Sequence, residues 1–332
     1  MGNFWHLLPR PFTVLAPMED VTDTVFRRIV SQSGRPDVFF TEFVNVDGMC
    51  SPGRDAVIHR LTFSKEERPL VAQIWGLAPD HYACAARDIK SMGFDGIDIN
   101  MGCPVKKIVK TGACSALIKN PSLAREIVIA TKEGAGSLPV SIKTRIGFSE
   151  KKTVEWSSFL LDLRPDALTM HGRIAKHMSD VPADWAEIGK VVQIRNAMKS
   201  DALIIGNGDV DSYETALRHH GRYGVDGIMI GRGVFHNIFV FQKDRNGRHY
   251  SDISTQSKIA YLRQHLQLQQ HTWGNVHNFN VMKKFVKIYI SSFGGASHLR
   301  SVLMAASNYS EMYSILNSWP SQSETTPHSV NE

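Results

Sequence analysis

The sequence predicts an α/β fold, a (β/α)8 TIM barrel followed by a small C-terminal helical domain. Short apolar, β-branched segments recur at intervals of roughly 25–40 residues, and each precedes a stretch that can form a helix. There are about eight such segments, and they stop near residue 240. A barrel of this type usually has about 250 residues, so this part of the chain matches it in length as well as in rhythm.

The main alternative is a doubly wound open sheet, which normally carries G-x-G-x-x-G after an early strand. The sequence has no such motif, because Gly231-Arg232-Gly233 has His236 at the third glycine position. The barrel is therefore favoured. Its expected strands, in chain order, are Phe12–Met18, Val38–Val44, Leu70–Gly76, Gly96–Gly102, Val140–Gly147, Ala167–Arg173, Leu203–Asp209 and Gly227–Gly233.

The pattern changes after residue 239. Residues 244–248 are polar and turn-like, and they predict a linker. From Thr255 to Asn317 apolar residues recur at helical spacing, and Phe293-Gly294-Gly295 divides this region into separate helices. The predicted organisation is a barrel over residues 1–242, a helical domain over 250–320 and a polar tail over 321–332.

The composition is typical of a globular protein, with 42% hydrophobic and 21% charged residues. A net charge of +6 points to an anionic partner without identifying it. The four cysteines include no C-x-x-C pair and no disulfide-framework spacing, as is typical of a reducing compartment. Met1–Pro9 lacks the apolar core of a signal peptide and no segment is suited to spanning a membrane, so we expect a cytoplasmic protein.

Polar or glycine-rich residues close nearly every predicted strand. In a barrel, catalytic and ligand-binding groups lie at the carboxyl ends of the strands. A single polar residue there can simply lie on the surface, but seven such ends together predict one polar pocket. The first strand ends in the apolar Ala16-Pro17-Met18, and the seven others end, in chain order, in Glu42, Gln73, Asn100 with Cys103, Lys143 with Arg145, His171 with Arg173, Asn207-Gly208-Asp209 and Gly231-Arg232.

The segment Asn100-Met101-Gly102-Cys103-Pro104 places a thiol at the mouth of a buried strand. Lys106 and Lys107 follow it, so the site is suited to chemistry on an anionic molecule. The alternative is a small buried cysteine in a turn. Because the other strands also end in polar groups, we interpret Cys103 as the candidate catalytic residue.

The seventh and eighth strands end in Gly206-Asn207-Gly208 and Gly231-Arg232-Gly233. Loops at these positions of a barrel often bind phosphate through backbone N–H groups, although two tight turns without a ligand would look the same. With amide, amine and imidazole donors on the other strand ends, a phosphate site suggests flavin mononucleotide (FMN). No metal is indicated, because the histidines are scattered.

These motifs together resemble the bacterial-type tRNA-dihydrouridine synthase family, from about residue 12 to about residue 310. N-x-G-C-P combined with the later motifs is highly specific, whereas A-P-M alone occurs in other flavin barrels. The matching segments are Leu15-Ala16-Pro17-Met18-Glu19, Thr22-Asp23, Phe26-Arg27, Gln73, Asn100 to Pro104, Lys143-Thr144-Arg145, His171-Gly172-Arg173, Ala183-Asp184-Trp185, Asn207-Gly208-Asp209, Gly231-Arg232-Gly233, Lys283-Lys284-Phe285 and Phe293-Gly294-Gly295.

The resemblance implies an enzyme that binds FMN in the barrel and uses NADPH to reduce the C5–C6 bond of a specific uridine in the D-loop of tRNA. Hydride would pass from flavin N5 to uracil C6, and Cys103 would donate a proton to C5. The implied flavin-binding residues are Ala16, Pro17, Met18, Gln73, Asn100, Lys143 and His171, with Asn207, Gly208, Asp209, Gly231 and Arg232 around the phosphate. The implied uracil contacts are Asn100, Lys143, Arg145 and Arg173.

A uridine in folded tRNA must leave its stack to reach a flavin, so the surrounding surface has to hold phosphates. Lys106, Lys107 and Lys110 follow the cysteine on a loop that we expect to be mobile, with Lys119 nearby. Lys283, Lys284 and Lys287 are spaced so that at least two share one helix face. Either cluster alone could be a solvated surface. The resemblance implies that the helical domain binds tRNA, and that the enzyme is a monomer with no obligate protein partner.

The chain departs from the family at two places. Cys114 stands where the family usually has the second glycine of a G-x-G segment, which raises the question of which thiol is the acid; the motif favours Cys103. Lys176-His177-Met178 replaces the usual residues after His171-Gly172-Arg173. Glu42 could orient the base or cap a strand end, and the sequence favours neither.

Two other functions fit parts of the pattern. One is a flavin oxidoreductase of a small pyrimidine-like metabolite, similar to dihydroorotate dehydrogenases. The basic helical domain and the N-x-G-C-P cysteine argue against it. The other is an RNA-binding protein without chemistry, which the joint presence of Cys103, Lys143 and His171 disfavours.

Overall fold

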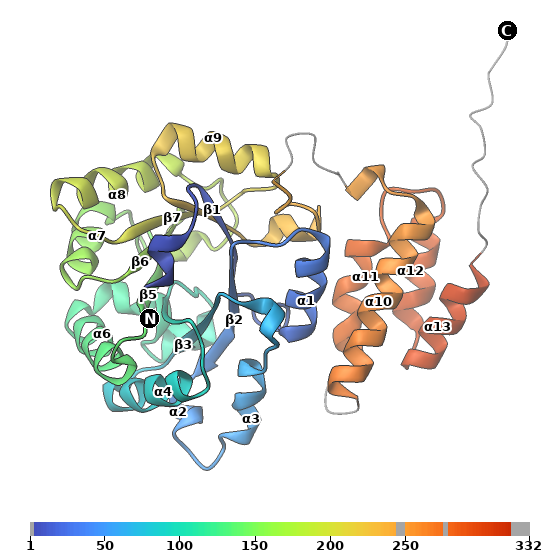
Figure 1. Cartoon of the computed structure of the whole chain (residues 1–332), viewed down its shortest axis with the longest axis horizontal. Coiled ribbons are helices and arrows are strands. Elements are labelled where there is room, and N and C mark those ends of the chain that lie inside the picture. Colours follow the sequence, from blue (N-terminus) through green and yellow to red (C-terminus); the bar gives the residue numbers. More distant parts are fainter. Residues whose placement is uncertain (1–2, 244–249, 275–277, 320–332) are drawn as a thin grey trace, which may run out of the picture. The chain divides into compact units, whose positions relative to one another are not determined.

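The structure is a computed structural model that describes residues 3–243, 250–274 and 278–319. The chain divides into two compact units, Met1–Gly247 and Arg248–Glu332. The first unit contains a closed barrel of eight parallel strands in chain order, β1 to β8 (Figure 1). The predicted (β/α)8 barrel is therefore confirmed.

All eight strands begin at the predicted residue. Seven of them end one to three residues early, because the last residues of each predicted segment leave the hydrogen-bonded ladder and form the loops at the barrel mouth. The observed strands are β1 Phe12–Leu15, β2 Val38–Asn45, β3 Leu70–Trp75, β4 Gly96–Met101, β5 Val140–Arg145, β6 Ala167–His171, β7 Leu203–Asn207 and β8 Gly227–Ile230.

The lower part of the barrel interior is apolar. Val14, Phe40, Val71 and Ile205 are fully or almost fully buried members of one core cluster. Trp5, in the short helix η1 (Phe4–Leu7), belongs to the same cluster, and its ring lies 5.7 Å from the ring of Phe12 and 6.4 Å from that of Phe40. The amino-terminal segment therefore closes the bottom of the barrel, a role that sequence reasoning did not assign to it.

The upper part of the interior is polar. Side chains two residues apart point to the same face of a strand, so Gln73 lies on the face of Val71 and above it. By the same period, Asp98 and Asn100 share one face of β4, and Ser141 and Lys143 share one face of β5. This change from apolar to polar along each strand concentrates functional groups at the carboxyl ends.

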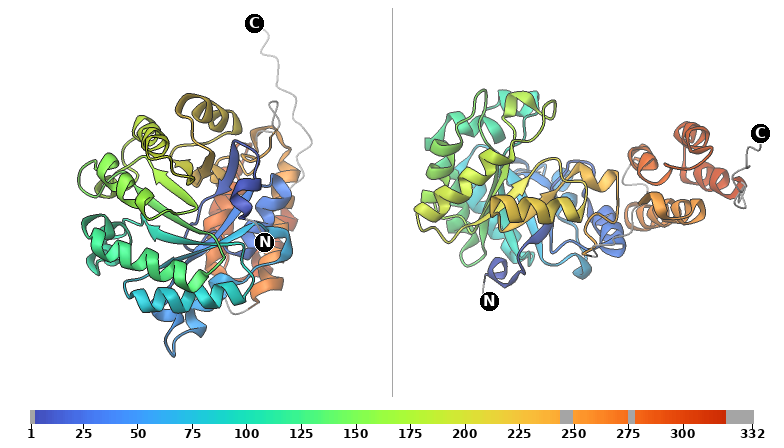
Figure 2. Two further views of the ribbon diagram at one scale, coloured as in Figure 1. Left: turned by 60° about the vertical axis from the view of Figure 1, so that its left-hand side comes forward. Right: turned by 90° about the horizontal axis from the view of Figure 1, so that it is seen from above.

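Helices cover the outside of the barrel (Figures 1 and 2). Side-chain oxygens of Asp23, Asp184 and Ser212 accept N–H groups at the starts of α1, α8 and α9, as N-cap residues commonly do. The longer helices of this unit are α1 Thr24–Ser33, α4 Pro79–Ser91, α6 Pro121–Ala135, α7 Thr153–Asp162, α8 Trp185–Ala197 and α9 Tyr213–Tyr223. The shorter ones are α2 Val46–Met49, α3 Asp55–Ile58, η2 His59–Leu61, η3 Lys65–Glu67, α5 Lys106–Lys110, η4 Cys114–Lys119, η5 Ala175–His177 and η6 Arg232–Phe235.

Two local expectations were wrong. The lysines at 106, 107 and 110 were expected on a loop, but they form the one-turn helix α5, because the N–H groups of Ile108 and Val109 both donate to the carbonyl of Val105. Glu42 was expected at a strand end, but β2 continues to Asn45. The register between β2 and β3 shifts between Phe40 and Phe43, as at a β-bulge, which re-aims side chains.

The second unit is helical, as predicted. Its helices are η7 Tyr250–Asp252, α10 Thr255–Trp273, η8 Phe279–Met282, α11 Lys283–Tyr289, α12 Ala296–Ala305 and α13 Tyr309–Ser318. Residues 293–295 separate α11 from α12, which confirms the predicted break. Buried leucines from α10, α12 and α13, such as Leu262, Leu299 and Leu316, contribute to its interior. The predicted linker at 244–248 and the tail at 321–332 lie outside the described residues.

Candidate active site

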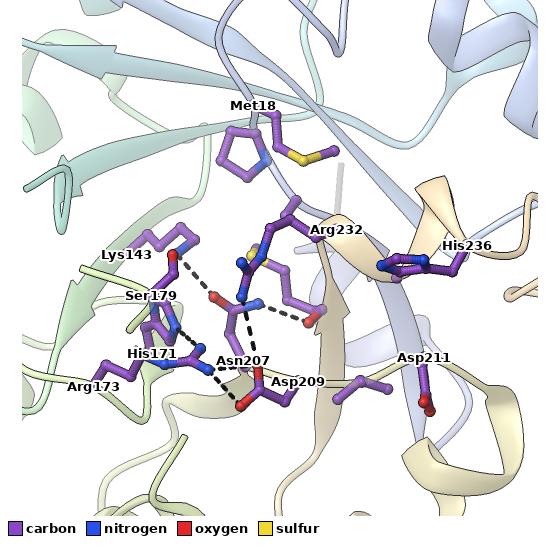
Figure 3. A pocket seen from close by; sticks show the side chains of 17 residues that line it. Met18, Lys143, His171, Arg173, Ser179, Asn207, Asp209, Asp211, Arg232 and His236 are labelled. Atoms are coloured by element: carbon purple, nitrogen blue, oxygen red, sulfur yellow. Dashed lines mark hydrogen bonds and ion pairs between the residues drawn. The ribbon is translucent and has the colours of Figure 1, made fainter. Parts of the chain in front are cut away.

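A cavity of about 460 Å³ opens at the carboxyl ends of the strands in the first unit (Figure 3). Its lining comes from the ends of β1, β5, β6, β7 and β8; the ends of β2, β3 and β4, which the sequence placed in the same pocket, do not line it. The lining residues that the sequence predicted are Ala16, Pro17, Met18, Lys143, His171, Arg173, Asn207, Gly208, Asp209, Gly231 and Arg232. Gly233, from the predicted phosphate loop, also lines it, and those that the sequence missed are Ser179, Val210, Asp211, Met229 and His236.

Lys143 is held across the barrel from its own strand. Its Nζ donates to Asn207 Oδ1 at 3.2 Å, and Asn207 Nδ2 donates to the carbonyl of Met229 at 2.8 Å (Figure 3). Burial, followed by the charge of Arg145, lowers the pKa of Lys143 to about 8. The Lys143 amine is thus mostly protonated at neutral pH and can release its proton near pH 8.

An ion-paired group forms another part of the cavity wall. Arg173 Nη2 donates to Asp209 Oδ1 at 2.6 Å, and Arg232 Nη2 lies 3.6 Å from the same oxygen (Figure 3). Burial alone would raise the pKa of Asp209, but the hydrogen bonds from Arg173 and from the Ala183 N–H, with the charges of Arg173 and Arg232, lower it. Asp209 is therefore an ionised acceptor at neutral pH.

His171 is a neutral imidazole in this setting. Arg173 Nη1 donates to its Nε2 at 3.1 Å, which makes that nitrogen an acceptor and leaves the proton on Nδ1. Burial, together with the charges of Arg145, Lys143, Arg173 and Arg232, holds the pKa of His171 well below its usual value.

Close backbone packing explains two glycines of the predicted phosphate site. Gly208 has φ +130°, and a Cβ there would lie 2.5 Å from the Cβ of Ala183. A Cβ on Gly233 would lie 2.1 Å from the carbonyl oxygen of Val210. Side chains at these positions would therefore displace the loops that line the cavity.

Cys103 lies on a separate turn just after β4. Asn100 Oδ1 accepts from the N–H groups of Gly102 and Cys103, at 3.0 Å each. Arg145 Nε donates to the carbonyl of Gly102 at 2.8 Å, and its Nη1 donates to the carbonyl of Met178 at 2.9 Å. Arg145, predicted to contact uracil, therefore also ties this turn to the loop after β6.

The thiol of Cys103 is acidified by a second cysteine. The pKa of Cys103 is lowered to about 7, mainly by a hydrogen bond from Cys114. Burial acts in the opposite direction, while the Val105 backbone and the charge of Arg145 lower the pKa further. Burial raises the pKa of Cys114 itself well above its usual value, so Cys114 keeps its proton and acts as the donor. Cys103 is half-buried whereas Cys114 is fully buried.

Gln73 and Asn100 lie outside the lining of the cavity. Gln73 is fully buried; its Nε2 donates to Asp98 Oδ2 at 2.7 Å, and its Oε1 accepts from Asn100 Nδ2 at 3.0 Å. Asp98, which sequence reasoning grouped with an apolar segment, is thus part of a buried polar chain below the cysteine turn. The sequence does contain an indication of this role, because Asp98 is a carboxylate between two isoleucines of a predicted strand.

Glu42 is a buried acid beside this region. It is 5% exposed, and burial, followed by the charges of Asp23 and Glu19, raises its pKa to about 8. The carboxyl group is therefore mostly protonated at neutral pH.

The predicted phosphate-contacting lysines are distributed over both units. Lys106 and Lys107 are exposed on α5, while the Nζ of Lys119 lies 4.1 Å above the ring of Phe148. In the second unit, Lys284 is exposed on α11 and Lys283 is half-buried, with its Nζ 6.0 Å from the ring centre of Phe279.

The described part of the chain contains neither a cluster of potential metal ligands nor a helix that could span a membrane. Within residues 3–243, 250–274 and 278–319, no three His, Cys, Asp or Glu side chains are grouped closely enough to hold a metal ion. None of the helices described there combines the length and apolar character required to cross a bilayer.

The fold is similar to that of solved enzymes with low sequence identity. The histamine dehydrogenase from Rhizobium sp. 4-9 is 14% identical with a TM-score of 0.54, over 77% of this chain and 48% of that one. A 2-naphthoyl-CoA reductase is 9% identical with a TM-score of 0.51, over 69% and 49%. This chain spans about half the length of both proteins, and the similarity shows the barrel fold alone.

Sequence comparison is more specific. The family model described as dihydrouridine synthase (Dus) matches residues 14–323. A probable tRNA-dihydrouridine synthase of Staphylococcus aureus (strain COL) is 42% identical over 323 residues, 96% of each chain. A probable tRNA-dihydrouridine synthase 2 of Bacillus subtilis (strain 168) is 43% identical over 318 residues, 95% of this chain and 96% of the relative. The chain is a member of the dihydrouridine synthase family.

Proposed function

We propose that this protein reduces the C5–C6 double bond of a uridine in the D-loop of tRNA to 5,6-dihydrouridine, with bound FMN and with NADPH as the reductant. One observation carries the proposal. At the carboxyl end of one barrel, a cavity lined by cationic and amide groups lies next to the turn of the acidified thiol, because Lys143 in its wall pairs in register with Asn100, whose side chain accepts the N–H of Cys103. Family membership supplies the substrate class.

The cavity fits FMN in size and chemistry. Its volume of about 460 Å³ lies in the range of roughly 300–1,000 Å³ typical of ligand pockets. Lys143 offers a positive charge to the ring system, and Arg232, with a side chain 59% exposed, offers one to a phosphate. Around Gly231 a Cβ would have no neighbour nearer than 3.6 Å, so a ligand can approach the backbone there. Lys143, His171, Asn207, Gly208 and Arg232 would hold the cofactor.

When bound, FMN supplies the hydride that adds to C6 of the uracil. Cys103 donates the proton to C5, and a pKa of about 7 lets its thiol be reprotonated from solvent between turnovers. Lys143 and Arg145 stabilise the negative charge that develops on the base during reduction. Asn100 holds the turn that carries the thiol.

The substrate has to be presented as an extruded base. A stacked uracil cannot reach a group inside a barrel mouth, so the enzyme must hold the tRNA backbone while the base leaves its stack. Exposed lysines on α5 and α11 are suited to phosphate contacts, as is the net charge of +6.

The test is to incubate the full-length protein with FMN, NADPH and an unmodified tRNA transcript, and to map dihydrouridine by mass spectrometry. We expect modification at one or two D-loop positions, and loss of the same positions in tRNA from cells that lack this gene and any redundant enzyme. Orotate in the same assay is the control for the small-metabolite alternative. Reduction of orotate with no change in any transcript would overturn the proposal.

Cys103→Ala separates the two halves of the reaction. The variant should still bind FMN and be reduced by NADPH, while formation of dihydrouridine should fall by roughly 100-fold or more, as expected for loss of a general acid. Turnover at the wild-type rate would show that another group supplies the proton.

A further inference from the structure

Asp98 is a fully buried carboxyl group that the proposed reaction does not use. It lies on β4, between β3 and β5, and each of its oxygens accepts one hydrogen bond. Asp98 Oδ1 accepts from Ser141 Oγ at 2.6 Å, and Asp98 Oδ2 accepts from Gln73 Nε2 at 2.7 Å. An ionised carboxylate offers only acceptors, so it determines which end of the Gln73 amide faces it.

That orientation propagates to the cysteine turn. With Nε2 directed at Asp98, Gln73 presents Oε1 to Asn100, and this oxygen accepts from Asn100 Nδ2 at 3.0 Å. Asn100 must then direct Oδ1 away from Gln73, where it accepts the N–H groups of Gly102 and Cys103. Each amide has one donor end and one acceptor end, so a single carboxylate fixes the sense of every hydrogen bond up to Cys103.

We propose that Asp98 is a positioning residue, which sets the orientation of the turn that carries Cys103 through the side chains of Gln73 and Asn100. The inference deepens the proposed function and rests on it for the role of the thiol. The hydrogen bonds from Asp98 to the cysteine turn involve only residues of this chain, so they hold whether or not the proposed function is right.

Protonation of Asp98 leaves the chain of hydrogen bonds in place only if Ser141 accepts the proton. Burial raises the pKa of Asp98 to about 6, against the hydrogen bonds of Ser141 and Gln73 and the charge of Lys143. On the flanking strands, β3 carries no titratable side chain, and β5 carries Lys143 and Arg145, of which Lys143 acts on Asp98. With the proton on Oδ1, Asp98 can donate to Ser141 Oγ while Oδ2 still accepts from Gln73, so the chain keeps its sense. Without the Ser141 hydroxyl, a protonated Asp98 would donate to Gln73 Oε1; the turned amide would then direct its Nε2 at Asn100 Nδ2, and two donors cannot bond.

Three substitutions separate positioning from simple filling of space. Asp98→Asn keeps the shape and can keep the sense of the chain, since its Oδ1 can accept from Gln73 and its Nδ2 can donate to Ser141 Oγ, but it cannot titrate. Asp98→Leu keeps a similar volume and offers no acceptor. Ser141→Ala removes a hydrogen bond that lowers the pKa of Asp98 and also removes the acceptor for its proton, so Asp98 should bind a proton at higher pH and turn the Gln73 amide.

The first measurement is the formation of dihydrouridine by full-length wild type, Asp98→Asn and Ser141→Ala between pH 5 and 8. We expect the turnover of Ser141→Ala, relative to wild type, to fall as the pH drops toward about 6 and below, because only in that variant does protonation of Asp98 turn the Gln73 amide. Asp98→Asn should keep turnover within about threefold of wild type across the whole range. A Ser141→Ala profile parallel to that of wild type would overturn the proposal.

The second measurement needs neither cofactor nor RNA. The rate of alkylation of Cys103 by iodoacetamide at pH 8, followed by peptide mass spectrometry, should be within about twofold of wild type in Asp98→Asn and altered at least fivefold in Asp98→Leu. Equal rates in all three proteins would refute the positioning role, even if the wild type formed no dihydrouridine and the proposed function itself failed. Should Asp98→Leu not fold, the pH profiles of the other two variants still decide.

Discussion

Cys114 occupies a backbone conformation that usually belongs to glycine. Its φ of +55° lies in the left-handed region, and its buried thiol donates a hydrogen bond to the sulfur of Cys103. The departure from the family pattern at this position therefore has a chemical effect. The second thiol is the largest single influence on the acidity of the first.

Cys114→Gly should raise the pKa of Cys103 from about 7 toward its ordinary value, because the variant removes the thiol that stabilises the thiolate. Glycine adopts a positive φ without steric cost, so we expect the variant to fold. The measurement is the pH midpoint for alkylation of Cys103 by iodoacetamide. Cys84→Ala, on α4, is the matched control and should leave the midpoint in place. An unchanged midpoint in Cys114→Gly would contradict this account.

Glu42 should make the protein less stable at alkaline pH. Its pKa is about 8 in the folded protein against 4.5 for the ordinary group, so the folded state binds the proton more tightly than the unfolded state does. The free energy of unfolding therefore falls as the pH rises from 4.5 through 8, by up to about 5 kcal/mol. Glu42→Gln removes this term, because an amide does not titrate.

Urea unfolding at pH 5, 7 and 9 measures the effect. Relative to wild type, Glu42→Gln should gain stability between pH 5 and 9, since only the wild type has to ionise a carboxyl that is 5% exposed. Asp98 contributes to the pH dependence of both proteins equally, so the difference between them isolates Glu42. Parallel curves for the two proteins would mean that Glu42 is solvated or paired when ionised.

At the scale of elements, the barrel could be predicted because its strands are buried on both faces. Such strands appear in the sequence as short apolar segments, and each polar residue that follows marks a strand end. This placed Lys143, His171 and Asn207 at one mouth without any knowledge of their contacts. The β2 register shift that carries Glu42 could not be predicted, because a bulge depends on pairing with β3 rather than on local sequence.

The contacts within the site were less predictable than its position. The sequence places Gln73 and Asn100 on neighbouring strands, but the register between strands decides that they touch each other. Asp98 reads as one polar residue in an apolar strand until its two partners are known. Likewise, helix α5 and a loop separate Cys103 from Cys114 in the sequence, and only folding brings the two thiols together.

At the scale of the whole molecule, positive charge is carried by both compact units. On α11 of the second unit, Phe285 and Ile288 are buried while Lys284 and Lys287, three residues apart, are exposed. Residues at this spacing lie on one face of a helix, so the two lysines form a cationic surface on the side opposite the packed one. A polyanion such as tRNA releases counterions when it contacts such a surface.

The double variant Lys284→Glu with Lys287→Glu should weaken tRNA binding in filter-binding or fluorescence assays, and should do so most at low salt. Each lost phosphate contact reduces the slope of log K against log salt by roughly 1, so the double variant should lower the slope by about 2. Turnover at saturating tRNA should change far less than affinity, because the reacting groups lie in the other unit. The charge-matched control is the double variant Arg164→Glu with Lys199→Glu, at exposed positions that precede β6 and β7 at the opposite end of the barrel from the cavity. If it reduced the slope as much as the α11 variant, net charge rather than a specific surface would govern binding.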